Sequence, residues 1–314
     1  MLKYIKIKYK PLEMVSEIKQ WITTTLNFIP NAFPGSQPVN LDWKSLFNLK
    51  QRKYVVTYKS DGERALLYSE GGISYYIDRK YEFRPTSVIT SISKTLLDGE
   101  IVWDIVDGKT TERYLVYDAI YVNGENVKNL PLLRRLFTFN TNLLQPSQVA
   151  NTAGEIYMKD FYSTTDIDVV RNLCKRLPHP CDGLVFTPAD EAYVAGRCHA
   201  LLKYKEGKYN TVDFSAYITG NRIELYCGKF GRDTVWVDYA YEQCNQFVHF
   251  LNNIRNPSIV ECEYIWNEHL HVGNWRIVRI RNDKDKPNDL KVLNWTYQTL
   301  ENLIDYKDLQ KELS

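Results

Sequence analysis

Residues 53–64, KYVVTYKSDGER, join an apolar run to a charged end, and this stretch decides the fold expected around it. The run KYVVTY is mostly β-branched or aromatic, which favours a strand. Ser60, Asp61 and Gly62 are residues typical of turns, so the strand should end near Lys59. The side chain of Lys59 would then project from a strand terminus toward a cleft.

Lys59 would have to be neutral in order to attack phosphorus, because only the unprotonated amine is a nucleophile. Burial or neighbouring cations lower the pKa of a lysine from its usual value of about 10.4. The pattern K-x-D-G does not establish such a role by itself, since short patterns of this kind also occur in exposed turns. The interpretation therefore depends on the rest of the chain.

Charged residues stand at the edges of strand-like runs along most of the chain. They occur in IDR (77–79), LDGE (97–100), YD (117–118), CDGLVF (181–186) and LKYKEG (202–207). Their order resembles the covalent nucleotidyltransferase superfamily, which includes mRNA capping enzymes and the ATP- or NAD-dependent ligases. The resemblance extends from Lys59 nearly to the C-terminus.

Two further stretches resemble the capping branch of that superfamily. Residues 275–284, WRIVRIRNDK, are similar to its R-x-R-x-D-K motif with a preceding tryptophan, a form that ligases usually lack. Residues 33–39, FPGSQPV, are similar to the P-G-x-x-P-V segment that precedes the nucleophile in capping enzymes. The length and layout of the chain approximate the small chlorella-virus type, which points to a viral source.

The resemblance implies an α+β fold in two domains. Residues 1–212 would form a nucleotidyltransferase domain that is ATP-grasp-like and built on antiparallel sheets. Residues 213–314 would form an OB-fold β-barrel domain, whose C-terminal helix packs back on the first domain. The sequence itself favours a barrel after residue 213, because short alternating strands with close turns begin there.

Periodicity predicts the positions of several elements. Residues 1–10 alternate apolar and basic side chains as in a strand, and residues 11–26 carry apolar side chains at helical spacing. Gly71 and Gly72 should turn a hairpin. A short helix is expected over residues 166–177, ended by prolines, and a last helix over residues 289–313.

The resemblance implies that Lys59 is the catalytic nucleophile. The residues implied to bind GTP are Asp61, Arg64, Arg79, Glu100, Tyr117, Lys159, Asp182, Lys203, Lys205, Arg281, Asp283 and Lys284. Arg64 and Arg79 would contact the ribose and phosphates, and Glu100 the ribose edge. Tyr117 would stack on guanine. Lys159, or less plausibly Asn123, would recognise the base.

The remaining implied roles concern the phosphates. Asp182 would bind a divalent metal ion, Mg²⁺ or Mn²⁺, while Lys203 and Lys205 would contact the α-phosphate. Three residues of the second domain would swing in on the β- and γ-phosphates: Arg281, Asp283 and Lys284. Asp213 would lie at the domain junction. Cations and a metal suit this chemistry because phosphoryl transfer builds negative charge on the phosphate oxygens.

The activity implied is that of an mRNA guanylyltransferase. It would form a lysyl-GMP intermediate from GTP, release pyrophosphate, and transfer GMP to the 5′-diphosphate end of RNA. Two alternatives remain open, an ATP-dependent polynucleotide ligase that uses the same lysine and a non-catalytic scaffold copy. The nucleotide that becomes attached to the protein distinguishes the first alternative, and the intact charged motifs argue against the second.

Composition excludes some classes of protein. The 40 basic and 38 acidic residues nearly cancel, so any contact with RNA must come from locally placed Lys and Arg. The six cysteines include no C-x-x-C pair, which argues against a zinc cluster and against a disulfide framework. We therefore expect reduced, mostly buried thiols.

Location and partners follow from what the sequence lacks. It shows neither a signal peptide nor an apolar run of membrane-spanning length, so we expect a cytoplasmic, nuclear or virion protein without a membrane contact. It also lacks the H-C-x-x-x-x-x-R loop of an RNA triphosphatase and the glycine-rich motif of a methyltransferase. A monomer that relies on a separate RNA triphosphatase and cap methyltransferase is expected.

Overall fold

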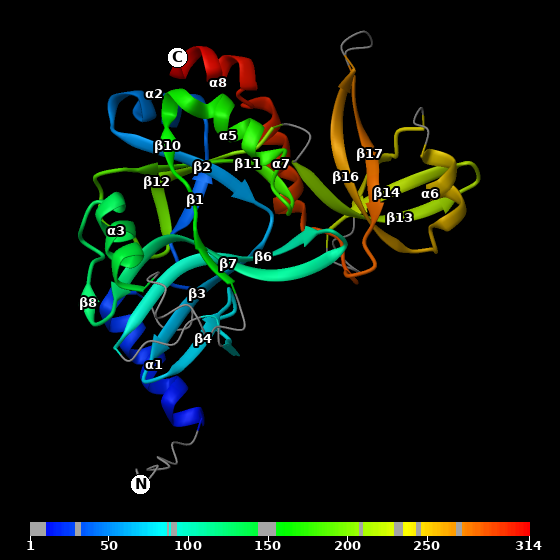
Figure 1. The fold of residues 1–314 in the computed structure, drawn as a ribbon. Helices are drawn as coiled ribbons and strands as arrows, with labels where there is room; N and C mark the ends of the chain where they lie inside the picture. Colours follow the sequence, from blue (N-terminus) through cyan, green and yellow to red (C-terminus); the bar gives the residue numbers. More distant parts are fainter. Residues whose placement is uncertain are drawn as a thin grey trace. The chain divides into compact units, whose positions relative to one another are not determined.

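The structure is a computed structural model that describes residues 11–28, 33–86, 88, 93–143, 155–206, 210–228, 235–242, 246–267 and 272–314 (Figure 1). The chain divides into two units, Met1–Tyr204 with Leu313–Ser314, and Lys205–Glu312. The strand expected over residues 1–10 lies outside the described ranges. Within those ranges, no helix is long and apolar enough to cross a membrane.

The larger sheet of the first unit has seven strands in the order β5-β4-β3-β6-β7-β8, with β9 paired to β7. Their bounds are β3 (Glu63–Glu70), β4 (Ile73–Ile77), β5 (Phe83–Thr86), β6 (Thr95–Val106), β7 (Lys109–Val122), β8 (Glu125–Asn126) and β9 (Glu155–Met158). The predicted hairpin joins β3 to β4, where Gly71 and Gly72 have φ of 60° and 81°. Glycine takes these values without the steric cost of a Cβ atom.

The smaller sheet of the first unit has five strands in the order β1-β12-β11-β2-β10. Their bounds are β1 (Gln37–Asn40), β2 (Tyr54–Ser60), β10 (Tyr162–Ser163), β11 (Cys181–Pro188) and β12 (Arg197–Tyr204). The expected antiparallel sheets are confirmed, although β1 runs parallel to β12 and β9 parallel to β7. The pairing of β2 with β11 brings Lys59 beside the CDGLVF stretch.

Helices cover the sheets of the first unit through apolar faces. The predicted first helix is present as α1 (Pro11–Leu26), and it buries Ile18, Ile22 and Leu26 in a cluster with residues of β3 and β4. The α3 helix (Leu132–Leu143) buries Phe139 against β6 and β7. In both segments the apolar residues recur at helical spacing. They therefore lie on one face of the helix, which packs against the sheet.

The α2 helix (Trp43–Gln51) was not predicted from the sequence. It begins with a capping box, in which Ser45 N donates to Asp42 Oδ1 at 2.7 Å and Asp42 N donates to Ser45 Oγ at 2.8 Å. Each bond satisfies a backbone N–H that the first helical turn leaves without a partner.

The predicted helix over residues 166–177 is present but shorter, as a 3₁₀ turn η1 (Thr164–Asp166) followed by α5 (Ile167–Cys174). Cys174 and Cys181 form a disulfide with their Cα atoms 5.5 Å apart. The prediction of free thiols is therefore wrong for these two residues, because the end of α5 lies within bridging distance of the start of β11. Cysteines 198, 227 and 262 are free and buried, and Cys244 lies outside the described residues.

The second unit is an antiparallel sheet in the order β15-β14-β13-β16-β17. Its elements are β13 (Thr211–Thr219), β14 (Arg222–Cys227), β15 (Val235–Tyr239), α6 (Phe247–Asn253), β16 (Ser258–Asn267) and β17 (Val272–Ile280). Trp275 is fully buried at its centre, with ring centroids of Phe214, Tyr264 and Tyr297 4.9–5.7 Å away. These short strands around one apolar core agree with the expected OB-like domain.

The single helix expected over residues 289–313 is two helices, α7 (Leu290–Glu301) and α8 (Tyr306–Leu313). Asn302 leaves the helical region at φ −108° and ψ 17°, and the Asp305 carboxylate accepts from Lys307 N at 3.1 Å. Asn and Asp compete in this way with helix continuation and favour caps. The packing of the last helix on the first domain stays a prediction.

Candidate active site

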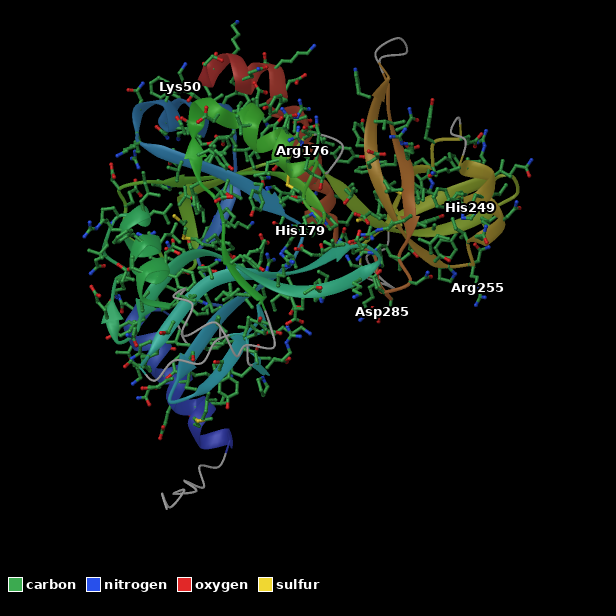
Figure 2. The ribbon with its side chains drawn as sticks, in the orientation of Figure 1. Lys50, Arg176, His179, His249, Arg255 and Asp285 are labelled. Atoms are coloured by element: carbon green, nitrogen blue, oxygen red, sulfur yellow. A yellow bond between two sulfur atoms is a disulfide. The ribbon has the colours of Figure 1, made fainter. Side chains whose placement is uncertain are left out.

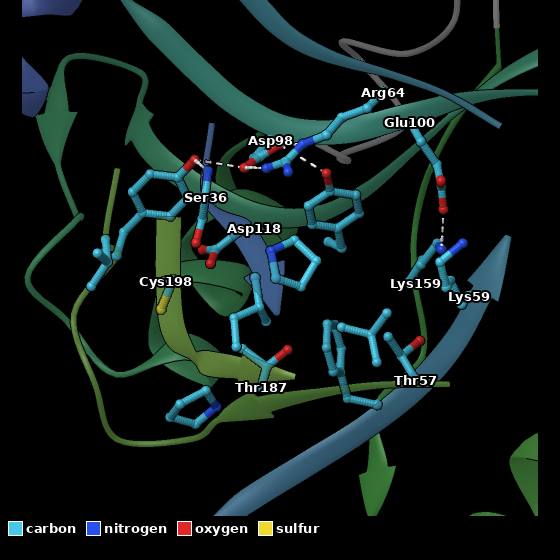
Figure 3. A pocket seen from close by; sticks show the side chains of 18 of the residues that line it. Ser36, Thr57, Lys59, Arg64, Asp98, Glu100, Asp118, Lys159, Thr187 and Cys198 are labelled. Atoms are coloured by element: carbon cyan, nitrogen blue, oxygen red, sulfur yellow. Dashed lines mark hydrogen bonds and ion pairs between the residues drawn. The ribbon is translucent and has the colours of Figure 1, made fainter. Parts of the chain in front are cut away.

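A cavity of about 220 Å³ lies between the two sheets of the first unit (Figure 3). Thr57 and Lys59 of β2 and Val185 of β11 line it from the smaller sheet. Arg64 of β3 and Glu100 of β6 line it from the larger sheet. Strands distant in the sequence thus bring their charged side chains to one space.

Lys59 stands at the end of β2 and faces a carboxylate. Its Nζ lies 2.6 Å from Asp182 Oδ1, and the two side chains are 21% and 13% exposed. In the ladder, Gly183 pairs with Lys59 and Cys181 with Ser60, so Asp182 is the extra residue of a β-bulge. A bulge bends its strand and redirects a side chain, which here turns the Asp182 carboxylate to Lys59.

Lys159 is buried beside Lys59, and its Nζ donates to a Glu100 carboxylate oxygen and, at 3.1 Å, to the carbonyl oxygen of Tyr58. The centroid of the Tyr117 ring lies 5.8 Å from this nitrogen. Burial lowers the pKa of Lys159, while the Glu100 charge opposes that shift. Two ammonium groups and two carboxylates therefore meet at this end of the cavity, as Figure 3 shows for three of them.

Asp98 is fully buried in β6 and joins several segments. It accepts from Arg64 Nη2 at 2.6 Å, from the Tyr117 hydroxyl at 2.9 Å and from the Tyr193 hydroxyl at 2.6 Å. The Tyr193 oxygen accepts from Ser36 N at 2.8 Å. Burial raises the pKa of both tyrosines well above the usual value, so their hydroxyls remain hydrogen-bond donors.

The FPGSQPV segment packs on Arg64. The guanidinium carbon lies 5.2 Å from the ring centroid of Phe33 and 5.6 Å from that of Tyr117. A Cβ added at Gly35 would lie 2.3 Å from Phe33 and 2.9 Å from Arg64 Nη2, so only glycine fits there. Burial acts to lower the pKa of Arg64, but the charge and hydrogen bonds of Asp98 together with the nearby Tyr117 and Tyr193 raise that pKa overall.

Arg135 of α3 forms a second buried ion pair at the cavity wall. Its Nε and Nη2 donate to the two carboxylate oxygens of Asp118 at 2.6 and 2.8 Å. Its Nη1 donates to the backbone carbonyl oxygens of Leu130 at 2.5 Å and Glu191 at 2.8 Å. The guanidinium thus fixes α3 and the loop around Glu191 against β7.

The structure brings most of the predicted residues of the first unit together. Those that line the cavity are Lys59, Asp61, Arg64, Arg79, Glu100, Tyr117 and Lys159. Lys203 pairs with Val185, which pairs with Thr57, so it shares their face of the sheet. Lys205 begins the second unit. Asn123 has φ 48° in the turn between β7 and β8 and is not among the described residues that line the cavity.

The predicted residues of the second unit gather on Asp213 of β13. Arg281 Nη1 lies 3.0 Å from Asp213 Oδ1, and Lys284 pairs with the other oxygen. Arg281 also makes two bonds to Asp283, at 2.8 and 2.7 Å, which lower the pKa of Asp283. The RNDK motif and Asp213 therefore form one network within this unit.

A divalent cation would have few protein ligands at Lys59. Among the described residues, no group of three or more His, Cys, Asp or Glu side chains could hold a metal ion. Mg²⁺ does not need such a group, because it usually binds one or two carboxylates together with substrate phosphates and water. Asp182, with one oxygen beside Lys59, fits that requirement.

Several residues of this site were missed by the sequence prediction. Asp98 was weighed with Glu100 as a ribose contact but not included in the predicted site, and Asp118 was noticed only as part of the YD pair. No role in the site was predicted for Arg135, Tyr193 or Ser36. A signal existed for Arg135, since it lies between Leu132, Leu136 and Phe139 on the buried face of α3, where a charged residue requires a partner.

Comparison with known proteins gives consistent matches. Residues 4–207 match the family model "mRNA capping enzyme, catalytic domain", and residues 201–310 match "mRNA capping enzyme, C-terminal domain". The chain is 30% identical over 347 residues to "mRNA-capping enzyme subunit alpha" of Schizosaccharomyces pombe, covering 96% of this chain and 85% of that protein. It is 28% identical over 319 residues to "mRNA-capping enzyme" of Caenorhabditis elegans, covering 91% of this chain.

The chain spans only 50% of the length of the Caenorhabditis elegans protein. Among solved structures, "mycobacterial DNA ligase D complexed with ATP and MES" is similar over 81% of this chain and 96% of that chain, with 14% identity and a TM-score of 0.49.

Proposed function

The chain belongs to the mRNA capping enzyme family, and from this premise we propose that it is an mRNA guanylyltransferase. Lys59 attacks the α-phosphorus of GTP, a nitrogen–phosphorus bond forms, and pyrophosphate leaves. The terminal oxygen of an RNA 5′-diphosphate then displaces Lys59 and completes the GpppN cap. The observation that carries this proposal is the position of Lys59 at the cavity, 2.6 Å from Asp182.

Asp182 is suited to act on the proton of Lys59. The amine must be neutral when it attacks, and Asp182 Oδ1 is within hydrogen-bonding distance of Nζ. Arg64, which lines the same cavity, stabilises negative charge that develops on the phosphate oxygens. Lys203, on the same sheet face, and Lys205 are proposed to contact the α-phosphate.

Arg64, Arg79, Asp61 and Glu100 are proposed to hold the ribose and phosphates. All four line the cavity that Lys59 also lines, which supports this assignment. Hydrogen bonds to Asp98 already hold the Arg64 guanidinium in one orientation, so a nucleotide would bind to an oriented group. Preorganised donors of this kind favour transfer because they need no rearrangement during the reaction.

Tyr117 and Lys159 are proposed to select guanine. The Tyr117 ring lies at the cavity, and the Lys159 ammonium is 5.8 Å from its centroid, so a base stacked on the ring has a cationic donor within reach. Guanine presents a carbonyl oxygen that accepts from an ammonium, whereas adenine presents an amino group at that position. A site built for the oxygen would therefore disfavour ATP.

A divalent cation, Mg²⁺ or Mn²⁺, is proposed to bind Asp182 together with the nucleotide phosphates. When bound, it would neutralise part of the charge on the phosphate oxygens. Arg281 and Lys284 are proposed to contact the β- and γ-phosphates, and Asp283 belongs to the same motif. For this, Arg281 and Lys284 would exchange their bonds to Asp213 for bonds to phosphate.

The acceptor is proposed to be RNA with a 5′-diphosphate end. A separate RNA triphosphatase would generate this end, and a separate methyltransferase would modify the cap. Release of γ-phosphate from triphosphate-ended RNA by the purified chain would contradict this part of the proposal. A monomeric state, a viral origin and a cytoplasmic, nuclear or virion location stay predictions.

The decisive experiment is incubation with α-labelled GTP or ATP and Mg²⁺ or Mn²⁺, followed by denaturing electrophoresis. We expect label from GTP on the wild-type chain and none on Lys59→Ala. Lys53→Ala is the matched control, because that lysine precedes the same strand but is 71% exposed and outside the cavity lining. Label from ATP in place of GTP would favour a ligase, and no label from either would favour a non-catalytic copy.

A further inference from the structure

A buried chain of hydrogen bonds ends at Ser60, the residue that follows Lys59. Ser60 Oγ lies 3.0 Å from His179 Nε2, and His179 Nδ1 lies 2.6 Å from Asp104 Oδ1. The three residues are 2%, 7% and 3% exposed. Arg113 Nε lies 2.9 Å from the second oxygen of Asp104. The proposed transfer reaction gives no role to these hydrogen-bonded residues.

The hydrogen-bonding partners define the state of the His179 ring. The Asp104 carboxylate can only accept, so Nδ1 carries a hydrogen. In the neutral ring, Nε2 then accepts from the Ser60 hydroxyl. A carboxylate that holds an imidazole in one tautomer and orientation is the arrangement that hydrolases use to direct a serine. Here Ser60 is buried, so the hydrogen bonds from Asp104 through His179 to Ser60 orient the end of β2 and not a nucleophile.

His179, which Figure 2 labels, precedes Asp182 of the bulge by three residues in the sequence. The backbone on either side of it is held as well, since Ile105 N donates to Pro178 O at 2.9 Å and Asp61 N donates to Pro180 O at 2.9 Å. At the bulge the β2–β11 register steps from Cys181 opposite Ser60 to Gly183 opposite Lys59, and Asp182 lies between these two pairs. The direction in which the Asp182 carboxylate points therefore depends on how the segment before Asp182 is held.

We propose that His179 is a positioning residue, which Asp104 orients and which holds the end of β2 and the start of β11 together so that Asp182 meets Lys59. The Lys59–Asp182 distance of 2.6 Å depends on both strand ends. Ser60 fixes one of them directly after Lys59, and His179 fixes the other. This inference rests on the proposed transfer of a nucleotide to Lys59.

The test separates the rate of transfer from nucleotide affinity. Ser60→Ala removes one bond of the chain, Ser60→Thr retains the hydroxyl, and Ser74→Ala is the matched control, because Ser74 is a buried serine in β4 that also makes a hydrogen bond, at 3.0 Å to Ser69. Single-turnover formation of the labelled adduct is followed over a range of GTP concentrations for each variant.

We expect Ser60→Ala to lower the maximal rate about 10- to 100-fold, the effect of a misplacement of about 1 Å, with an unchanged GTP concentration at half-maximal rate. Ser60→Thr should recover most of the rate, and Ser74→Ala should match the wild type. If Ser60→Ala does not fold, Asp104→Asn keeps the side-chain shape while removing the charge that orients His179, and the same loss of rate is expected.

An unchanged maximal rate in the folded variant would overturn the positioning role and leave the proposed function intact. A rise in the half-saturating GTP concentration without a change in rate would overturn it too, because it would place Ser60 in nucleotide binding. Absence of any adduct on the wild-type chain would instead overturn the proposed function, and the positioning role with it.

Discussion

Arg135 and Asp118 form a buried ion pair in the first unit through two hydrogen bonds. Nε donates to Oδ1 at 2.6 Å, and Nη2 donates to Oδ2 at 2.8 Å. The Arg135 side chain is 2% exposed and the Asp118 side chain 10%. A charge this far from water depends on its partner, because a lone buried carboxylate has lost its hydration without replacement.

Arg135→Ala should therefore lower the free energy of unfolding by about 3–5 kcal/mol, the usual cost of breaking a buried ion pair. Urea denaturation provides the measurement. Arg52→Ala is the matched control, because its pair with Glu191 is 57% and 41% exposed and such pairs contribute about 0–1 kcal/mol. Equal losses in the two variants would mean that the Asp118 charge is hydrated in the folded chain.

Asp182→Asn should reduce adduct formation at Lys59 by about 100-fold or more, because an amide cannot take the proton from the lysine. Quenched single-turnover labelling with GTP measures the rate. Asp190→Asn is a suitable comparison, since that carboxylate is 64% exposed and lies outside the cavity lining. A rate within twofold of the wild type would show that Asp182 does not act on Lys59.

Trp275→Ala should destabilise the second unit by about 3–5 kcal/mol, because it removes a fully buried indole and leaves a cavity. The Tyr297 hydroxyl, which accepts from Trp275 Nε1 at 2.9 Å, would also lose a partner. Thermal unfolding followed by circular dichroism should show the shift. Trp266→Ala, 59% exposed in the same sheet, should shift the midpoint little, and a comparable shift would contradict the prediction.

Cys227 should resist alkylation in the folded chain. Burial raises the pKa of Cys227 from 9.0 to about 11, so at pH 9 about 1% of the folded thiol is ionised against about half in the unfolded chain. Iodoacetamide labelling, read by mass spectrometry, should be at least about 50-fold slower in the folded protein.

The same shift predicts how stability depends on pH. The pKa of Cys227 is higher in the folded chain than in the unfolded chain. The free energy of unfolding therefore keeps its full contribution from the protonated thiol below pH 9 and declines as the pH rises toward 11. Cys227→Ala should remove this part of the decline in unfolding free energy. Fast labelling of Cys227 under native conditions, or an unaltered decline in the variant, would be inconsistent with its burial.

The sequence predicted those features that local pattern determines. The helix bounds 11–26 match α1, and the end of β2 falls next to Lys59, because apolar spacing and turn residues act over a few positions. The order of charged motifs also led to the residues that line the cavity. The family resemblance, not periodicity, supplied their proposed roles.

Features that depend on how elements pack on one another could not be predicted in the same way. Cys174 meets Cys181 only because α5 packs beside β11, and Asp118 meets Arg135 only because α3 packs on β7. The bulge at Asp182 arises from sheet register, which leaves no trace in a single stretch of sequence. The break between α7 and α8 was the exception, since Asn302 and Asp305 did signal it locally.

The hydrogen bond from Ser36 to Tyr193 joins residues 157 positions apart, and the bond from Tyr193 to Asp98 spans 95. Contacts of such separation form slowly, because a long loop must close before they stabilise anything. Asp98, Tyr193 and Ser36 should thus be among the last residues of the first unit to come together. A chain still on its way to the native state would have no place for a nucleotide, so uptake of GTP would mark the completion of folding.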